Sequence, residues 1–408
     1  MGFLWKTAWR SIWRNGRRTV ITVGAISFAL AVSVFFVSFT DGGAAGTTDY
    51  AVRMQAGHVT LQHPGYLDAP AIALVVDGAD ELRPALQKLD GVETVKLLVL
   101  GQGVARSSSE TGGVSVMGVE PTVEAATSVI ARKVVAGSYL ERDEDRTVVI
   151  GRVLADRLGL EVGRKLVLTS TGASGDLVEE LLRIQGIFAT GADDIDGYLI
   201  QMPLRTAQRL FGLRPDQVTQ IGLVVGNLRQ RDSVLAGASR VVAARPIAVL
   251  PWEKVIPELA AHLRVDGSTN RVLMGVLLFL SLFTVFNTIQ MSVLERTREL
   301  AMLLALGTPP WRLRAQVLLE GAVLASLGCA VGLLVGGLAG YWLQIHGVDV
   351  SQVGKGQSVS GVPIDVVYAR VSADRMVSFG AFVLVVTLAA SAWCARRISK
   401  IVVAEAIR

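Results

Sequence analysis

The sequence predicts an α-helical membrane protein with four transmembrane helices and a large α+β extracytoplasmic domain between helices one and two. Hydrophobic residues make up 51% of the 408 residues and charged residues only 18%, with a mean hydropathy of +0.47. This balance is too apolar for an ordinary soluble protein. Four segments are also long and apolar enough to cross a hydrocarbon core of roughly 30 Å.

The four predicted spans carry one formal charge between them, Glu320. They are residues 19–40, 272–294, 315–343 and 376–395. A buried core helix is the alternative for any one of these segments, but four in one chain favour a membrane. Glu320 follows Arg314 closely. We therefore expect it to pair or snorkel near the membrane surface rather than serve in transport, because a proton relay needs more such groups.

Basic residues beside the spans predict the orientation. Segments 1–18, 295–314 and 396–408 hold 13 of the 40 basic residues and three of the acidic ones, so we place them and both termini on the cytoplasmic side of the membrane. Residues 1–18 predict an amphipathic helix on the membrane surface, followed by an uncleaved signal anchor. This clustering explains the basic charge without nucleic acid, which we exclude as a partner.

Residues 41–271 predict the large domain. Strand and helix patterns alternate there, and we expect an α+β subdomain interrupted by a β-rich insertion at about residues 121–215. Asp77 is the expected N-cap of a helix that stops at Gly91. Residues 344–375 are rich in glycine and serine, which predicts a short extracytoplasmic loop.

No motif for catalysis is present in the sequence. The P-loop, H-E-x-x-H and G-x-S-x-G patterns are missing, so we predict no enzymatic activity and no cofactor in this chain. His58 and His63 fall on opposite faces of a predicted strand, which favours surface or turn histidines over a metal site. The acidic runs 141–145 and 193–196 lack the spacing of a calcium loop and predict solvated turns.

A strip of small residues marks the third span. It consists of Gly328, Gly332, Gly336 and Gly340, one residue in every four. Such a strip lets another helix approach closely. Packing inside the bundle and contact between two protomers are both compatible with this spacing.

A short amphipathic helix is predicted between the second and third spans. Charged residues after Leu294 precede Leu300, Leu303, Leu304 and Gly307, which share one helical face. Gly307 and the pair Pro309-Pro310 predict its end. A simple interfacial turn is the alternative, but a membrane protein moved by a cytoplasmic motor also presents such a helix.

The segment MSVLERTRELAMLLALGTPPWRLR resembles the coupling segment of ABC transporter permeases of the MacB/FtsX/LolC-LolE superfamily. TAWRSIWRNGRRTVITVGAISFALAV resembles their N-terminus, GSYLERDEDRTVVIGRVLADRLGLEVGRKLVLTS their MacB-like periplasmic core, and RRISKIVVAEAIR their C-terminal tail. The resemblance follows the order of these segments along the whole chain.

The resemblance implies a multi-pass permease of the bacterial inner membrane that works by mechanotransmission. Its partners are expected to be two ABC ATPase subunits, which bind the ATP and Mg²⁺, and a second permease that is another copy or a paralogue. The segment PWEKVIPELAAHLRVDGSTN is the implied stalk that leads into the second span. The implied ATPase-facing residues are Glu295, Arg296, Arg298, Glu299, Leu300, Leu303 and Leu304.

Three outputs fit this resemblance, and extraction of lipoproteins or lipids for transfer to a periplasmic carrier is the one we favour. MacB-like export with an adaptor and FtsX-like signalling to a cell-wall hydrolase are the alternatives, and a membrane-anchored receptor or scaffold is the alternative outside this family. A lipid anchor has to leave the outer leaflet sideways, so we expect its path between the first two spans. The expected lining residues are Phe35, Phe36, Phe39, Leu273, Val276 and Leu277.

Overall fold

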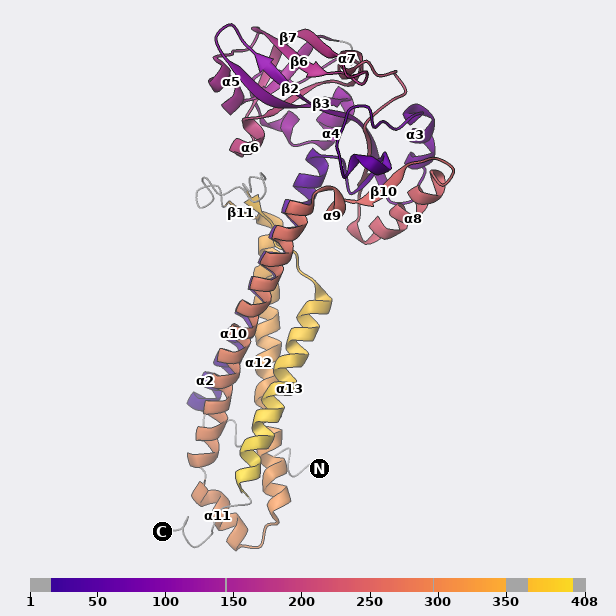
Figure 1. The fold of residues 1–408 in the computed structure, drawn as a ribbon. Coiled ribbons are helices and arrows are strands. Elements are labelled where there is room, and N and C mark those ends of the chain that lie inside the picture. Colours follow the sequence, from indigo (N-terminus) through magenta and orange to yellow (C-terminus); the bar gives the residue numbers. More distant parts are fainter. Residues whose placement is uncertain (1–15, 144, 296, 350–365, 399–408) are drawn as a thin grey trace. The chain divides into compact units, whose positions relative to one another are not determined.

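The computed structural model describes residues 16–143, 145–295, 297–349 and 366–398 (Figure 1). They form two compact units. The helical unit contains the described residues of Met1–Ala44, Val265–Asp349 and Val366–Arg408, and the sheet unit contains Ala45–Arg264. Most of the amphipathic helix expected at residues 1–18 and the end of the tail, residues 399–408, lie outside the described residues, and residues 16–18 form the start of a longer helix.

The long helices carry the predicted spans, but they extend beyond them. They are α2 (Gly16–Met54), α10 (Pro257–Glu295), α12 (Pro310–His346) and α13 (Ala373–Ile398), and the short helix α11 (Thr297–Ala305) follows α10. Among the described residues, three segments are long and apolar enough to span a membrane: Thr19–Met54, Pro310–His346 and Ala373–Trp393. The predicted second span lies inside α10.

The expected boundaries at residues 40 and 272 are therefore not helix ends. At both places the apolar pattern stops while the backbone remains helical. The last residues of α2 and the first of α10 belong to the sheet unit, where packing rather than hydropathy maintains the helix. In the loop 344–375, Val348–Asp349 (β11) pairs with Val366–Val367 (β12), and residues 350–365 lie outside the described residues.

One apolar cluster joins the four long helices of the helical unit. Ile26, Leu30 and Val34 of α2 are buried in it together with Cys329 of α12. The partly buried side chains around them are Phe286 of α10, Leu333 of α12, and Met376, Phe379, Val383 and Leu384 of α13. The second expected span thus contributes to the same core as the other three.

The glycine strip of α12 lies mainly against α2. A Cβ atom added at Gly328 would lie 2.6 Å from Cγ2 of Ile26, and one at Gly332 would lie 2.8 Å from the carbonyl oxygen of Ser27. Gly336 meets Ala31 in the same way, and Gly340 faces Val371 and Ser38. The Ser27 hydroxyl also donates to the carbonyl oxygen of Gly328 at 3.0 Å. Packing within one chain therefore accounts for the strip.

The sheet unit is built on one mixed sheet of 10 strands in the order β10-β1-β9-β2-β3-β8-β5-β7-β4, with β6 paired to β2 and β7. Only the β3–β8 and β5–β7 pairs are parallel among the described strands of this sheet. The strands are β1 (Val59–Gln62), β2 (Val92–Arg106), β3 (Thr111–Val119), β4 (Val134–Gly137), β5 (Thr147–Gly151), β6 (Lys165–Thr171), β7 (Leu177–Phe188), β8 (Leu199–Pro203), β9 (Gln220–Val225) and β10 (Ala248–Pro251).

Short helices connect these strands. They are α3 (Ala79–Gln87), α4 (Pro121–Thr127), α5 (Arg152–Leu158), α6 (Asp193–Asp196), α7 (Leu204–Phe211), α8 (Arg231–Val241) and α9 (Trp252–Val255), with the 3-10 turns η1 (Pro64–Tyr66), η2 (Ile130–Lys133) and η3 (Leu228–Gln230). The β-rich insertion expected at about 121–215 shares its sheet with the rest of the domain, because β4 to β8 belong to the same sheet as β1, β2 and β9.

Alternation along the strands divides the apolar residues between two cores. Val95, Leu97 and Val99 of β2 belong to the larger core, which α3, α5, α7 and α8 also enter. Leu98 of β2 points to the smaller core, which contains Met54 at the end of α2. Successive side chains of a strand face opposite sides, so β2 contributes to both cores.

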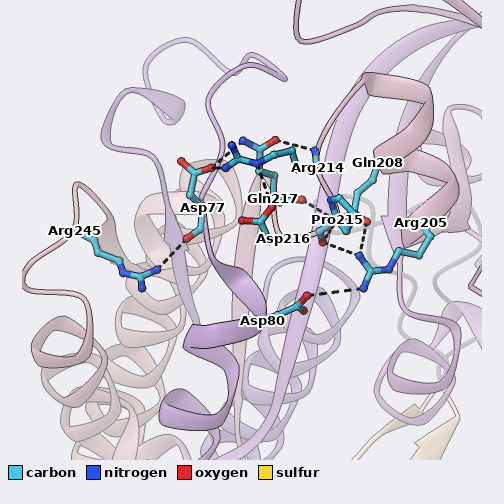
Figure 2. A network of polar contacts seen from close by, with 9 residues as sticks. All are labelled: Asp77, Asp80, Arg205, Gln208, Arg214, Pro215, Asp216, Gln217 and Arg245. Carbon is cyan, nitrogen blue, oxygen red and sulfur yellow. Dashed lines mark hydrogen bonds and ion pairs between the residues drawn. The ribbon is translucent and has the colours of Figure 1, made fainter.

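The start of α3 corrects the expected cap. Gly78, at φ 69°, precedes Ala79, and no side chain caps the helix. The Asp77 carboxylate instead accepts hydrogen bonds from Nη2 of Arg214 at 2.7 Å and Nε2 of Gln217 at 2.8 Å, while Arg245 donates to its backbone carbonyl (Figure 2). Asp77 therefore ties the loop before β9 to α3 rather than capping the helix.

The α2–α12 contact leads to a first prediction. Gly332→Ala places a methyl group against the backbone of Ser27, so the helices have to separate, and we expect a loss of about 1–3 kcal/mol of unfolding free energy. Thermal unfolding of the full chain in nanodiscs measures it. Gly24→Ala in α2 is the matched control, because its Cβ meets nothing within 4 Å. Equal melting temperatures for the two variants would contradict the close approach.

Candidate coupling sites

The predicted coupling segment is a separate short helix. After α10 ends at Glu295, α11 runs from Thr297 to Ala305, and Gly307 at φ 85° ends it before α12 begins at Pro310. Arg296 and the side chains of Glu295, Glu299, Leu300 and Leu303 lie outside the described residues. A glycine suits this left-handed position because it has no Cβ atom.

The described side chains of α11 divide into two faces. Ala301 is fully buried and Leu304 is half-buried. Arg298, Met302 and Ala305 are exposed one turn apart, with Met302 52% exposed, and Leu306 beyond the helix is 82% exposed. The exposed face is thus centred on Met302, next to the leucine face that the sequence indicated.

The expected substrate-path residues lie on the surfaces of α2 and α10. Phe35, Leu273 and Val276 are exposed, whereas Phe36, Phe39 and Leu277 are half-buried. The rings of Phe35 and Phe39 stack with their centroids 6.5 Å apart. None of these six residues belongs to the described apolar cluster that joins the four long helices. The structure therefore provides apolar surface at these positions without joining them into one site.

Glu320 is buried in α12, with 7% of its surface exposed. The neighbouring Gly321 lies against the hydroxyl of Ser391 in α13, so this part of α12 faces α13. The sequence led us to expect pairing or snorkelling near the membrane surface. The burial of Glu320 within the helical unit argues against extension of its side chain toward water.

Within the sheet unit, the end of α2 and the start of α10 pack together. Ala51 and Val52 of α2 are buried in one cluster with Trp252 of α9 and Leu259 and Ala260 of α10. The sequence predicted the stalk that contains the last three of these residues, but not its contact with α2. We call this cluster the stalk root.

His58 links the stalk root to the sheet and corrects a prediction. Its side chain is fully buried rather than at the surface, and Nδ1 accepts a hydrogen bond from the Val225 amide at 3.1 Å. Its carbonyl oxygen accepts from the Trp252 amide at 3.1 Å. Nε2 lies 3.6 Å from Oδ1 of Asp49 on α2. The odd spacing of His58 and His63 separates their faces, but His58 is buried because it immediately precedes β1, which pairs with β9 and β10 on its two sides.

Ion pairs surround the end of α2 in the sheet unit, and one of them, Arg53–Glu93, joins α2 to β2. Arg53 on α2 contacts Asp49 one turn earlier and Glu93 of β2, each at 2.9 Å. Lys96 of β2 pairs with Glu124 of α4 at 2.7 Å, with both side chains 1% exposed. Lys96 was not among the residues predicted from the sequence. Its signal is the strand alternation, which puts Lys96 on the same face as the buried Leu98.

The acidic run at residues 193–196 has a structural role. Asp196 is buried and accepts hydrogen bonds from the Thr190 amide and hydroxyl and from the Gly191 amide, at 2.7 to 3.0 Å. It therefore closes a turn, although it is not solvated as expected. No group of three or more potential metal ligands occurs among the described residues, and Glu144 of the other acidic run lies outside them.

The sequence matches two protein families in succession. The MacB-like periplasmic core domain matches residues 19–243, more than half of the chain, and the FtsX-like permease C-terminal domain matches residues 271–403. The chain belongs to the MacB/FtsX/LolC-LolE superfamily of ABC transporter permeases. This permease is accordingly a multi-pass membrane protein with a periplasmic domain, and its families are non-catalytic transporter subunits.

The permease is similar to several curated proteins at low identity. It is 23% identical to the lipoprotein-releasing system transmembrane protein LolC of Xylella fastidiosa over 231 residues, 55% of each chain. It is 22% identical to LolC of Neisseria meningitidis over 335 residues, 78% of each chain. It is 25% identical to the pyoverdine export ATP-binding/permease protein PvdT of Pseudomonas aeruginosa over 355 residues, 82% of this chain and 51% of PvdT.

The permease spans about half the length of the Xylella LolC proteins. Among solved structures, it is similar to the periplasmic region of MacB from Actinobacillus actinomycetemcomitans, with 9% identity and a TM-score of 0.37. This likeness covers 51% of the permease and 95% of the MacB region. The family assignment rests on the two sequence matches.

Burial of His58 leads to a pH prediction. Burial lowers the pKa of His58 below its ordinary value of 6.5, so below pH 6.5 the unfolded chain binds more protons than the folded one. The neutral imidazole of His58 makes its full contribution to the unfolding free energy above pH 6.5. This contribution is lost as the pH falls toward the pKa of His58 in the folded state. His58→Asn keeps an acceptor near the Nδ1 position and removes the titration. We therefore expect this variant to flatten the fall in unfolding free energy between about pH 6.5 and 5.

Denaturant unfolding of the full chain in detergent at several pH values measures this slope. His63→Asn is the matched control, since His63 is half-buried and accepts only a local hydrogen bond from the Gly65 amide among the described contacts. Parallel profiles for wild type and His58→Asn would show that His58 does not set the acid sensitivity.

Proposed function

We propose that this chain is the permease subunit of an ATP-driven transporter that works by mechanotransmission. The main support for this proposal is the continuity of two helices. Both α2 and α10 have one part in the helical unit and one part in the sheet unit, with no break in the helix between them. The α11 segment follows α10 directly. A force applied at α11 therefore reaches α10, and the stalk root connects α10 with α2 in the sheet unit.

The proposed topology has four spans, with α10 crossing the inner membrane as the second and both termini in the cytoplasm. The participation of α10 in the four-helix cluster and the basic residues beside the spans support it. We propose two ABC ATPase subunits, with their ATP and Mg²⁺, as cytoplasmic partners and a second permease as the membrane partner. Membership of an ABC permease family supports the ATPase partner.

The proposed cargo is a lipoprotein or lipid taken from the outer leaflet and passed to a periplasmic carrier. The similarity to LolC proteins supports this output, as does the apolar surface of α2 and α10 at Phe35, Leu273 and Val276. MacB-like export of periplasmic substrates with an adaptor is the second candidate. The similarity to PvdT and the match to the MacB-like periplasmic core favour it.

The coupling proposal predicts that a charge on α11 weakens the contact with the ATPase. Met302→Asp is the cleaner variant because Met302 is exposed in this chain, while Leu300→Asp and Leu304→Asp test the leucine face. A buried, unpaired charge at an interface costs about 2 kcal/mol or more, so permease-stimulated ATP hydrolysis should fall at least about tenfold.

The measurement is ATPase activity of the purified complex in nanodiscs, together with the amount of ATPase that co-purifies. Leu177→Asp is the matched control, because Leu177 is 79% exposed on β7. Wild-type stimulation in all three α11 variants would remove α11 from the coupling mechanism.

The cargo proposal predicts contact between α2 or α10 and an acylated substrate. Photo-crosslinking amino acids at the six path positions should capture a lipoprotein in native membranes when ATP hydrolysis is blocked by vanadate. Leu334 of α12, 61% exposed, is the matched control that should capture bulk lipid only. Bulk lipid alone at all six path positions would instead favour the MacB-like output, in which cargo does not enter between the spans.

A further inference from the structure

A fully buried ion pair lies where α2 ends in the sheet unit. Nζ of Lys96 on β2 is 2.7 Å from Oε2 of Glu124 on α4, and each side chain is 1% exposed. Charged side chains are almost never buried to this extent unless they are paired. Stability alone is a weak reason for such a pair, because an apolar pair of similar volume is often equally stable or more stable.

The remaining contacts of Lys96 are with the C-terminal end of α2. Its ammonium group donates to the carbonyl oxygen of Arg53 at 2.8 Å and is 3.3 Å from that of Gln55. With the ion pair to Glu124, these contacts surround the ammonium group with three oxygen atoms. The last carbonyls of a helix lack partners within the helix, and the negative end of the helix dipole attracts a cation. Lys96 thus caps α2 from a strand of the sheet.

Glu124 extends this connection into the sheet unit. Its Oε1 lies 3.4 Å from Nε2 of Gln201 on β8, and Oε1 of Gln201 accepts from the hydroxyl of Tyr139 at 2.8 Å. Burial, together with the charge of Glu124, raises the pKa of Tyr139 well above its usual range, so its hydroxyl remains a donor. A continuous polar chain therefore runs from the α2 carbonyls through β2 and α4 to β8 and Tyr139.

The more exposed ion pairs of Arg53 with Asp49 and Glu93 are weaker candidates for linking the end of α2 to the sheet. Arg53, Asp49 and Glu93 are 21%, 45% and 44% exposed, so water screens their attraction. Lys96 and Glu124 are shielded from water, and Lys96 binds backbone atoms of α2 rather than another flexible side chain. A displacement of the end of α2 thus acts most directly on Lys96.

We propose that Lys96 and Glu124 are positioning residues that clamp the C-terminus of α2 to β2 and α4, so that movement of α2 is passed to the sheet. This inference rests on the proposed mechanotransmission function and identifies where the movement enters the periplasmic domain. An apolar pair would fill the same space, but it has no donor for the α2 carbonyls. The charges are retained in the core because they hold the helix end.

The test replaces both charges at once, as Lys96→Met with Glu124→Leu, so that no unpaired charge remains in the core. The full chain is purified from membranes with its ATPase and placed in nanodiscs. Hydrogen–deuterium exchange is then compared between the nucleotide-free and the ATP–vanadate states. The matched control is Arg83→Met with Glu120→Leu, which removes an ion pair between α3 and the residue before α4. Thermal melting confirms that both double variants are folded.

We expect exchange in the last turn of α2 to rise by about tenfold in the Lys96/Glu124 variant, because its carbonyls lose a charged donor. The nucleotide-dependent change should persist in α2 but disappear from β2 and α4. Wild type and the Arg83/Glu120 control should show it in all three elements. A purely structural role would alter exchange in both nucleotide states equally and leave the difference between them intact.

Two results would overturn the proposal, and they are distinguishable. If the Lys96/Glu124 variant transmits the nucleotide-dependent change to β2 and α4 as wild type does, the clamp is wrong while mechanotransmission stands. If wild type shows no nucleotide-dependent change in α2 or in the sheet unit, the proposed function is wrong and the clamp falls with it.

Discussion

Inside the hydrocarbon core of a membrane, every backbone amide has to find its partner within the chain, and the long helices of this permease meet that requirement. α2 and α10 remain helical beyond their apolar stretches, to Met54 and from Pro257. A loop at either place would absorb a movement by changing its backbone angles, whereas a helix transmits it along its hydrogen-bond ladder. The stalk root and the Lys96 cap depend on this continuity, because both act on helix ends that reach the sheet unit.

Different interactions stabilise the helical unit and the sheet unit, each within itself. In the helical unit, glycines of α12 bring the backbone of α2 close, so the contact consists of dispersion forces and the Ser27 hydrogen bond. In the sheet unit, apolar residues that alternate along the strands form two cores, and a few polar groups are buried near the C-terminal end of α2. Polar interactions are directional, so they specify where the helix end lies in a way that apolar packing alone does not.

The proposed ATPase contact on α11 and the Lys96–Glu124 pair require opposite degrees of solvent exposure. A contact with a separate subunit has to be accessible in this chain, as Met302 of α11 is, whereas a rigid joint within the chain has to exclude water, as Lys96 and Glu124 do. Burial strengthens an ion pair by lowering the local dielectric constant, and exposure weakens it. The same contrast separates the buried His58 from the exposed acidic partner Asp49 beside it.

Features set by local periodicity and span length followed from the sequence. They are three of the four apolar spans, the glycine strip, most strands of the domain, and a helix ended by Gly307 before Pro310. Each of these features depends on hydropathy and residue spacing within one short segment of the sequence. The structure alone decided which distant segments meet. It brought β4 to β8 into one sheet with β1 and β9, turned Asp77 toward Arg214 instead of its own helix, buried His58, and placed Lys96 at the end of α2. The alternation within β2 predicts that Lys96 faces inward. Its partners, however, lie 43 residues earlier, at Arg53, and on α4. The contacts that stabilise this buried charge therefore form only when the chain folds.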